Sequence, residues 1–429
     1  MFNILNETME NKKYICIDLK CFYASVECVE RGLDPFKTNL VVADESRGKG
    51  GICLAISPAM KALGIKNRCR LFEIPQNIEY IIAKPRMKKY MEVSAKIYSI
   101  YLKYISPEDI HIYSIDECFI DATPYIHLYK KNAKEIAIML MDAVMEETGI
   151  CAAAGIGTNL FLAKVALDIT AKKTKDHIGF LNEEEFKTQI WHHKPITDIW
   201  NIGYGIAKRL SVYGIYDMCG VTKIREEVLY KEFGINAELL IDHAWGRESC
   251  TMQDIKNFKS KSNSISNGQI LFEDYTFDNA FTVLEEMVDM LTLELTEKNM
   301  VTDSVFLSVG YSKHEISHTG GSKKLKDFSS NFSEIIKAVK ELYYQTTNKN
   351  HLIRRLNVGF GNIVNKDFTK FQLSLFPESK KNTKEELLQK TVVKIKDKFG
   401  KNSILRGISL QKHATAQKRN KLVGGHNAE

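Results

Sequence analysis

Two adjacent carboxylates, Asp116 and Glu117, stand between two short apolar runs that are typical of strands, within residues 113–121. Successive side chains of a regular strand point to opposite faces, so these two acids can converge only where the chain bends, as in a hairpin. Acids at a hairpin tip can hold Mg²⁺, which prefers carboxylate and phosphate oxygens. A solvated acidic turn is the alternative, and it is the more common case for an isolated Asp-Glu pair.

A third carboxylate, Asp18, directly follows the apolar residues 14–17 and precedes a segment rich in aromatic residues that begins a helix. Strands of α/β sheets place ligand chemistry at their carboxyl ends, so Asp18 is a candidate partner for Asp116 and Glu117. Three carboxylates can bridge two divalent ions roughly 3.5 to 4 Å apart, which is the arrangement that phosphoryl transfer from a nucleotide requires.

The two acidic segments resemble the palm motifs of the Y-family translesion DNA polymerases, of the bacterial UmuC and DinB type, and further matching segments cover most of residues 12–376. The resemblance implies that the catalytic residues are Asp18, Asp116 and Glu117, which would hold two Mg²⁺ ions with help from the backbone carbonyl of Leu19. It also implies that the incoming dNTP meets Cys21, Phe22 and Tyr23, and that Tyr23 excludes a ribose. Many relatives have a second acid where this chain has Lys20, but that acid is not the principal ligand, so the two-metal site should remain.

Two lysines are candidates for contacts with the triphosphate. Lys61 lies in the segment 57–65 and Lys164 in the segment 155–164, and both resemble phosphate-contacting positions of the family. Many relatives carry Arg at the first position with Tyr three residues earlier. Here Lys61 follows Pro58, so a bidentate contact is lost and a point-charge contact remains. Without the resemblance, either lysine would be interpreted as a solvated surface charge.

The composition is compatible with a large enzyme that binds nucleic acid. The 429 residues suffice for two or more domains, and a hydrophobic content of 44% suffices for their cores. The formal net charge of +7 suits DNA binding. The nine Cys include no Cys-x-x-Cys pair, which argues against a zinc site and against a disulfide framework. The sequence has neither an apolar run of membrane-spanning length nor a signal-peptide pattern, so we expect a cytoplasmic protein without membrane contact.

Apolar periodicity predicts an α/β and α+β multidomain protein. Strand patterns at 12–18, 110–121 and 151–157, with helical spacing at 90–104 and 136–144, predict an α/β domain. From residue 175 to the polar linker that precedes residue 264, the pattern is wholly helical. The resemblance then implies a right-hand polymerase with a palm at 1–23 and 86–172, fingers at 24–85, a helical thumb at 173–250, a linker at 251–263, a little finger at 264–365 and a C-terminal tail at 366–429.

Residues 199–210 resemble a helix-hairpin-helix. Gly203 and Gly205 would let the turn expose backbone N–H groups, and the following helix start, with Lys208 nearby, would favour a DNA phosphate. The alternative is a Gly-capped turn between packed helices.

The periodicity of residues 264–365 predicts the order β-α-β-β-α-β, which is that of the little finger, the extra DNA-binding domain of the family. Candidate contacts with the DNA backbone are Arg354 and Arg355 beside the last strand, and Lys323, Lys324 and Lys326 in the preceding loop. Exposed basic residues in loops usually serve solubility only, which is the alternative here.

Residues 372–376 read Gln-Leu-Ser-Leu-Phe and resemble the short peptide with which bacterial polymerases bind the sliding clamp. The candidate contacts are Gln372, Leu373, Leu375 and Phe376. Leu375 and Phe376 would fill an apolar pocket while Gln372 supplies an orienting hydrogen bond. The alternative is the end of a buried strand. A helix is predicted beyond this peptide, at 384–399.

We therefore expect a monomeric, template-directed DNA polymerase of low fidelity that performs translesion synthesis. Its expected partners are primer–template DNA, dNTP and the bacterial sliding clamp, with accessory SOS proteins as a further class. Two alternatives are a catalytically weak DNA-binding accessory factor, which would lack an acidic ligand, and a nucleotide cyclase, which needs neither a helix-hairpin-helix nor a little finger. The presence of Asp18, Asp116 and Glu117 argues against the accessory factor.

Overall fold

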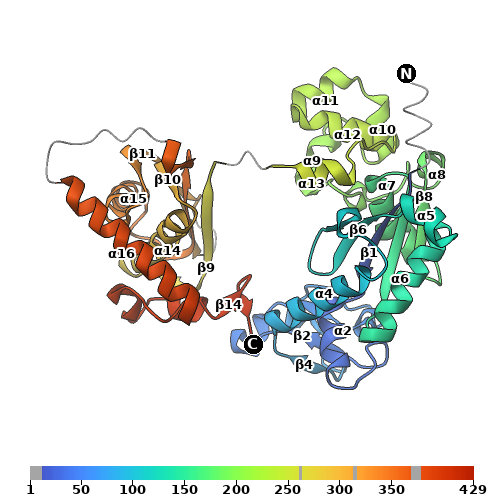
Figure 1. Cartoon of the computed structure of the whole chain (residues 1–429), viewed down its shortest axis with the longest axis horizontal. Coiled ribbons are helices and arrows are strands. Elements are labelled where there is room, and N and C mark those ends of the chain that lie inside the picture. Colours follow the sequence, from blue (N-terminus) through green and yellow to red (C-terminus); the bar gives the residue numbers. More distant parts are fainter. Residues whose placement is uncertain (1–11, 260–262, 313–315, 369–377) are drawn as a thin grey trace. The chain divides into compact units, whose positions relative to one another are not determined.

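The computed structural model describes residues 12–259, 263–312, 316–368 and 378–429, and the chain divides into two compact units (Figure 1). The first unit is Met1–Lys259 with His426–Glu429, and the second is Ser260–Gly425. Each unit has apolar cores of its own. The mixed α/β and multidomain fold class that the sequence predicts is therefore confirmed.

A five-stranded sheet forms the centre of the first unit, in the order β5-β6-β1-β7-β8. Its strands are β1 Tyr14–Leu19, β5 Ile110–Ile112, β6 Glu117–Asp121, β7 Ala152–Gly157 and β8 Ile178–Leu181. Neighbouring strands are antiparallel except β7 and β8, which are parallel. The central strand β1 is buried along nearly its whole length, as its continuous apolar run predicts. The strand pattern expected at 110–121 is divided into β5 and β6 by a bend, as the convergence of Asp116 and Glu117 requires.

Helices of the same unit are α4 Met87–Tyr101, α5 Thr123–Tyr129, α6 Ala133–Thr148 and α7 Leu160–Val165, which continues into a π-helical turn at Ala166–Thr170. Helix α7 packs directly on β7. A Cβ atom added to Gly155 would lie 2.1 Å from the carbonyl oxygen of Ala163, and one added to Gly157 would lie 2.2 Å from the amide nitrogen of the same residue. Only glycine permits this approach, which holds the helix that carries Lys164 against the sheet.

The region between residue 175 and the linker was expected to be wholly helical, and this expectation is wrong at residues 178–181. They form β8, in which Ile178 and Leu181 are buried, and Gly179 lets the π-helical turn approach closely. Four apolar residues are too few to show a period, so pairing with β7 decides their conformation rather than a local pattern.

The insert between the first strand and α4 has a three-stranded sheet in the order β3-β2-β4. Its elements are α2 Phe22–Val29, β2 Leu40–Val42, β3 Ala55–Ile56, α3 Pro58–Ala62 and β4 Ile81–Ala83. The helices that follow β8 are α8 Glu183–Gln189, α9 Tyr204–Ser211, α10 Met218–Lys223, α11 Glu226–Phe233, α12 Asn236–Ala244 and α13 Met252–Asn257. Many of these helices share one apolar core with α7, so the helical region is anchored on the central sheet.

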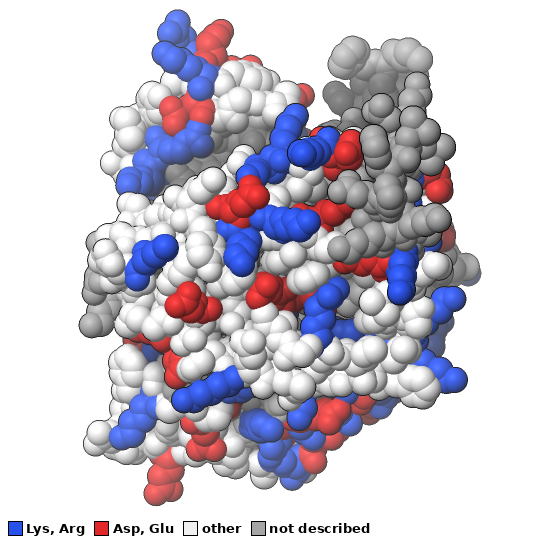
Figure 2. Space-filling model, turned by 90° about the vertical axis from the view of Figure 1, so that its left-hand side faces the viewer, with Lys and Arg blue, Asp and Glu red and all other residues white. Residues whose placement is uncertain are grey.

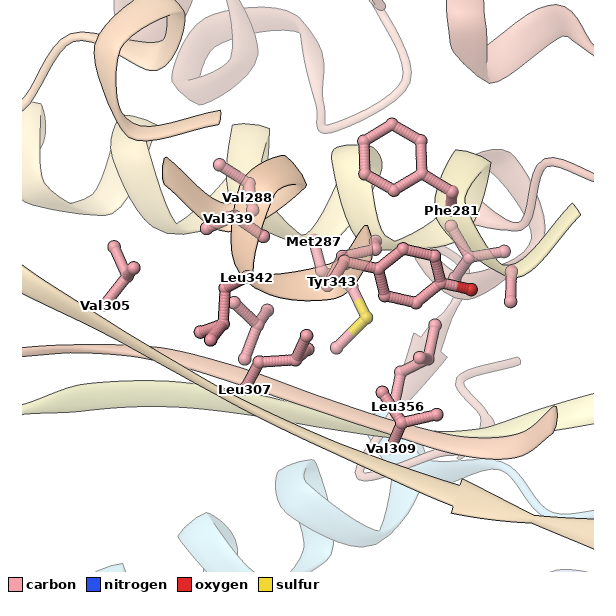
Figure 3. Close-up of a cluster of buried hydrophobic side chains, with 14 of the residues drawn as sticks. Phe281, Met287, Val288, Val305, Leu307, Val309, Val339, Leu342, Tyr343 and Leu356 are labelled. Atoms are coloured by element: carbon pink, nitrogen blue, oxygen red, sulfur yellow. The ribbon is translucent and has the colours of Figure 1, made fainter. Parts of the chain in front are cut away.

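The second unit has the order β-α-β-β-α-β that the periodicity predicts. Its main elements are β9 Ile265–Tyr275, α14 Phe277–Glu297, β10 Met300–Tyr311, β11 Thr319–Ser329, α15 Phe332–Thr346 and β12 Ile353–Gly361, followed by β13 Val364–Asn365. The four long strands form an antiparallel sheet in the order β11-β10-β12-β9. Figure 3 shows apolar side chains of α14 and α15, among them Met287 and Leu342, packed on Leu307, Val309 and Leu356 of the sheet.

Residues 378–425, expected as a tail, pack on the second unit. They include α16 Glu378–Phe399, α17 Ala416–Arg419 and β14 Leu422–Val423. Gln389 of α16 is 2% exposed and donates to Oγ1 of Thr296 at 2.9 Å. The buried carboxylate of Glu286 accepts from the amide nitrogen of Thr415 at 2.7 Å. These contacts satisfy buried polar groups of α14, which would otherwise cost stability.

Candidate active site

The three predicted metal ligands lie at one end of the paired strands β1 and β6. Asp18 and Glu117 are directly opposite each other in the antiparallel register. The next amide, that of Leu19, donates to the carbonyl oxygen of Asp116 at 2.9 Å. The amides of residues 113 and 114 both donate to the carbonyl oxygen of Glu117 at 3.0 Å, which closes the hairpin at the bend. The structure thus brings together acids that are about a hundred residues apart in the chain.

The electrostatics of this end of the sheet suit a bound cation. Burial, followed by the negative charges of Asp116 and Glu117, raises the pKa of Asp18 from 3.8 to about 7. Without a bound metal ion, Asp18 is therefore only partly ionised at neutral pH. A divalent ion with oxygen preference would remove that penalty, so the donor set fits Mg²⁺.

Other groups hold two of the acids in the structure. Nζ of Lys164 lies 2.7 Å from Oε1 of Glu117 and 3.0 Å from Oδ1 of Asp168, and Oγ of Ser114 donates to Oδ1 of Asp116 at 2.6 Å. In these side-chain orientations, no three His, Cys, Asp or Glu residues of the described ranges converge as metal ligands. Oε1 of Glu117 is therefore occupied by Lys164 in this arrangement.

Helix α2 begins next to the acids and carries the expected nucleotide contacts. Cys21, before its first residue, has a left-handed backbone with φ 49°. The ring of Tyr23 is half-buried and stacks on the ring of Tyr90, with centroids 4.5 Å apart. Burial, followed by the negative charge of Asp116, raises the pKa of Tyr23, so this residue lies within electrostatic reach of the acidic site. Phe22 is only 2% exposed, so its side chain belongs to the core and only its backbone is available to a nucleotide.

The exposed Lys61, at the end of α3, lies beside Cys21. Burial raises the pKa of the Cys21 thiol, and the charge and hydrogen bond of Lys61 oppose that rise. Lys20 is in the same neighbourhood, where burial lowers its pKa and the positive charge of Lys61 adds to this effect. Two basic side chains therefore stand near the start of α2, where the resemblance expects the triphosphate.

Comparisons with known proteins agree with this geometry. Models of the impB/mucB/samB family and of its C-terminal domain match residues 17–168 and 262–375. The chain is 32% identical to the "Putative UV-damage repair protein UvrX" and 30% identical to "DNA polymerase IV 2", both of Bacillus subtilis. These matches cover 97% of this chain with 97% of the first relative and 99% of the second. A Y-family DNA polymerase chimera of Dbh and Dpo4 has a similar fold, with a TM-score of 0.62 and 22% identity over 82% of this chain and 99% of the chimera.

The chain belongs to the Y family of DNA polymerases. The expected family, the right-hand polymerase fold and the enzyme class, a DNA-directed DNA polymerase, are thereby confirmed. Y-family polymerases depend on divalent metal ions and bind DNA, which agrees with an acidic site in a basic protein. None of the helices in the described ranges is long and apolar enough to cross a membrane.

In this polymerase, the predicted helix-hairpin-helix lies on an open surface. Gly203 precedes α9, Gly205 is inside it, and Cβ atoms added to either would meet no atom within 4 Å. Lys208 is exposed on the same helix, and Tyr204 is 78% exposed. The indole nitrogen of Trp200 donates to the hydroxyl of Tyr113 at 3.0 Å, which ties the preceding turn to the acidic hairpin.

The basic residues expected to contact DNA in the second unit have different environments. Arg355 is exposed and paired with Gly310, on the sheet face opposite the helices. Arg354 instead forms an ion pair with Asp274 at 3.4 Å. The three lysines lie on β11, so their placement in a loop was wrong, and Lys323 pairs with Glu341. Lys324 and Lys326 are exposed. Figure 2 shows basic and acidic side chains interspersed over the face in view.

The expected clamp contacts Gln372, Leu373, Leu375 and Phe376 lie outside the described residues. Their flanks are described: Lys366–Phe368 form a 3₁₀ turn after β13, and α16 begins at Glu378. Both flanks belong to the second unit. The peptide is therefore part of an internal connection, with a folded segment on either side.

Sequence reasoning missed several residues of the site. Asp168 follows Lys164 at helical i,i+4 spacing, a signal that could have predicted their ion pair. Ser114 stands two residues before Asp116, which is the usual spacing of a turn that a side chain stabilises. The sequence does not indicate that Tyr90 is part of the site, because the helical spacing of apolar residues predicts only that Tyr90 lies on the buried face of α4.

Proposed function

We propose that this Y-family polymerase adds deoxynucleotides to a primer 3′ end across damaged or distorted template, with low fidelity. The observation that carries the proposal is the placement of Asp18 opposite Glu117 and next to Asp116, at the start of the helix that bears Tyr23. Relatives named for DNA polymerase IV and for UV-damage repair support the polymerase and the damage-tolerance parts of the proposal.

The carboxylates of Asp18, Asp116 and Glu117, with the backbone carbonyl of Leu19, would hold two Mg²⁺ ions. Bound there, the ions would activate the attacking 3′ hydroxyl and neutralise the leaving pyrophosphate. The raised pKa of Asp18 supports this assignment, because a carboxylate that is buried beside two other acids gains from a bound cation.

Lys61 and Lys164 would contact the triphosphate of the incoming dNTP. Lys61 is exposed and would exchange its contact with Cys21 for a phosphate oxygen, whereas Lys164 would exchange Glu117 for a phosphate oxygen and keep Asp168. Tyr23 would exclude the 2′ hydroxyl of a ribonucleotide by contact, with Cys21 and the backbone of Phe22 beside the sugar.

Primer–template DNA would be held by its backbone at two places. The turn at Gly203 and Gly205, with Lys208, suits a phosphate because exposed backbone N–H groups and the start of α9 favour an anion. Arg355, together with Lys324 on the same face of the sheet, would contribute charge in the second unit. Arg354 and Lys323 would first have to leave their acidic partners.

Residues 372–376 would bind the bacterial sliding clamp from the connection between β13 and α16. Both flanking segments belong to the second unit, so the peptide stays attached to that unit at both of its ends.

Primer extension with purified protein, dNTP and Mg²⁺ on undamaged and abasic templates tests the proposal. Product that passes the abasic site is the expected result. Extension on the undamaged template alone would show that the protein is a polymerase but does not bypass an abasic lesion. Firm DNA binding without extension on either template would favour a catalytically weak accessory factor instead.

A further inference from the structure

Tyr90 packs against Tyr23, the residue expected to exclude ribonucleotides. Its ring is 0% exposed, and the ring of Tyr23 stacks on it with an interplanar angle of 16°. The two residues belong to different helices, Tyr90 to α4 and Tyr23 to α2. The buried ring of Tyr90 therefore supports one face of the Tyr23 ring.

A buried carboxylate fixes the ring of Tyr90 in turn. The Tyr90 hydroxyl donates to Oε1 of Glu27 at 2.8 Å, and Glu27 is 0% exposed. Arg86 donates to both oxygens of Glu27 at 2.9 Å, and Arg31 also pairs with this carboxylate. A bidentate, charge-assisted contact of this kind is directional, so it defines where the hydroxyl of Tyr90 must lie.

The ion pair also joins the two ends of the expected fingers. Glu27 lies on α2, where the chain enters this segment, and Arg86 directly precedes α4, where it returns. Because Glu27 on α2 is bonded to Arg86 at the other end of the expected fingers, it keeps the hydroxyl of Tyr90 at a fixed position relative to α2 even if the fingers move. Breaking one partner of a buried pair is costly, because the other charge remains buried.

We propose that Tyr90, held by Glu27 and Arg86, is a positioning residue that fixes the ring of Tyr23 and thereby sets the discrimination between ribonucleotides and deoxyribonucleotides. The inference rests on the proposed gate function of Tyr23. A steric gate rejects a substrate for one additional oxygen atom, so a small displacement of the ring is enough to admit it. Removal of the supporting ring should therefore relax sugar selection without removal of the gate itself.

The experiment compares kcat/KM for a ribonucleotide with kcat/KM for the matching deoxyribonucleotide in four variants and the wild type. Tyr90→Leu removes the stack and should raise the ribonucleotide share roughly three- to tenfold, the range that one aromatic pair contributes. Tyr90→Phe keeps the ring, loses the hydrogen bond to Glu27, and should give a smaller rise. Tyr23→Ala should give the largest rise.

Tyr125→Phe is the matched control, because it removes a hydroxyl that donates to Asp109 at 2.8 Å elsewhere in the same unit. Its sugar discrimination should equal that of the wild type. Thermal midpoints of all variants separate loss of folding from loss of selection, and Tyr90→Phe keeps the test open if Tyr90→Leu does not fold.

Two results would overturn the inference in distinguishable ways. If Tyr23→Ala relaxes sugar selection while folded Tyr90→Leu and Tyr90→Phe select as the wild type does, Tyr23 is the gate and Tyr90 does not position it. If Tyr23→Ala selects as the wild type does, the gate function itself is wrong, and the inference is lost with it.

Discussion

Nζ of Lys164 lies 2.7 Å from Oε1 of Glu117, so a buried lysine pairs with a carboxylate that is expected to hold a metal ion. The side chains of both residues are only 10% exposed, and the neighbouring acids, together with a hydrogen bond to Glu117, raise the pKa of Lys164 against the effect of burial. The lysine remains charged in this environment. If Glu117 holds a metal ion as proposed, that ion and Lys164 should compete for Glu117, and Asp168 can retain the lysine when the metal ion binds.

Substitution of Lys164 should separate metal binding from nucleotide use. In Lys164→Met, the acids lose their internal cation, so Mn²⁺ should bind without nucleotide roughly three- to tenfold more tightly, since buried charges interact strongly. Primer extension should fall at least about tenfold, because the triphosphate loses a cationic contact. Titration calorimetry and single-turnover extension measure the two effects.

The matched control is Lys172→Met, which changes an exposed lysine of the same unit and should alter neither quantity. Unchanged or weaker Mn²⁺ binding by folded Lys164→Met would show that Lys164 and the metal ion do not compete.

The stability of the metal-free protein should depend on pH through Asp18. Its pKa in the folded protein, about 7, exceeds the ordinary value of 3.8, so the folded state binds the proton more tightly than the unfolded state. Stability is therefore lost as the pH rises from about 4 to about 7, by at most about 4 kcal/mol. Asp18→Asn should raise the thermal midpoint in EDTA at about pH 8 and have little effect at about pH 4.

Magnesium supplies the complementary control, because it should stabilise the wild type more at the higher pH, where Asp18 is ionised. An Asp18→Asn protein that is no more stable than the wild type at the higher pH would contradict the raised pKa of Asp18, which burial and the neighbouring acids cause.

Lys208 should contribute to DNA affinity but not to sequence choice. Lys208→Ala should weaken primer–template binding by a similar factor on unrelated sequences and reduce the slope of log K against log salt by about 1. Fluorescence anisotropy over a salt series gives both numbers. Lys223→Ala, at an exposed position of α10, is the matched control. Equal salt slopes for the two variants would remove Lys208 from the DNA contact.

Substitutions in residues 372–376, the expected clamp-binding peptide, should affect only the DNA synthesis that the sliding clamp stimulates. A ring-shaped clamp would keep the polymerase near the primer end at an effective concentration on the order of mM. The double variant Leu375→Ala and Phe376→Ala should therefore retain basal extension and bare-DNA affinity, and lose stimulation by the cognate clamp.

A control double variant, Leu387→Ala and Leu388→Ala, removes two exposed leucines of α16 and should be stimulated as the wild type is. Joint loss of unstimulated activity and thermal stability in the Leu375 and Phe376 variant would identify these residues as part of the core of the second unit.

The sequence predicts best where a pattern repeats or where chemistry demands a residue type. The spacing of Leu284, Val288, Leu291 and Leu295 predicts the buried face of α14, and all four are buried. The bend at Asp116 follows from the need of two adjacent acids to converge, and the structure has a hairpin there. Both predictions depend on neighbours that are close in the chain.

Contacts between distant segments could not be predicted. The stack of Tyr23 on Tyr90 and the bond of Tyr90 to Glu27 join α2 and α4 across the whole insert, and no local pattern encodes them. Lys323, Lys324 and Lys326 were expected in a loop, yet they lie on β11, which pairs with β10. Glycine and lysine are depleted in strands, so the local sequence does not indicate this strand. Gln389 looks like a surface residue in the sequence, but it is buried by partners on three other segments.

The central claim is that Asp116 and Glu117, opposite Asp18, carry the chemistry of nucleotide addition. Single-turnover extension of a primer–template by the wild type, Asp116→Ala and Glu117→Ala, with DNA affinity measured in parallel, tests it most directly. Loss of several kcal/mol of transition-state stabilisation should lower the rate of each variant on the order of a thousandfold or more. Primer–template affinity should stay close to that of the wild type. A rate near that of the wild type in either variant would contradict the assignment of the catalytic acids.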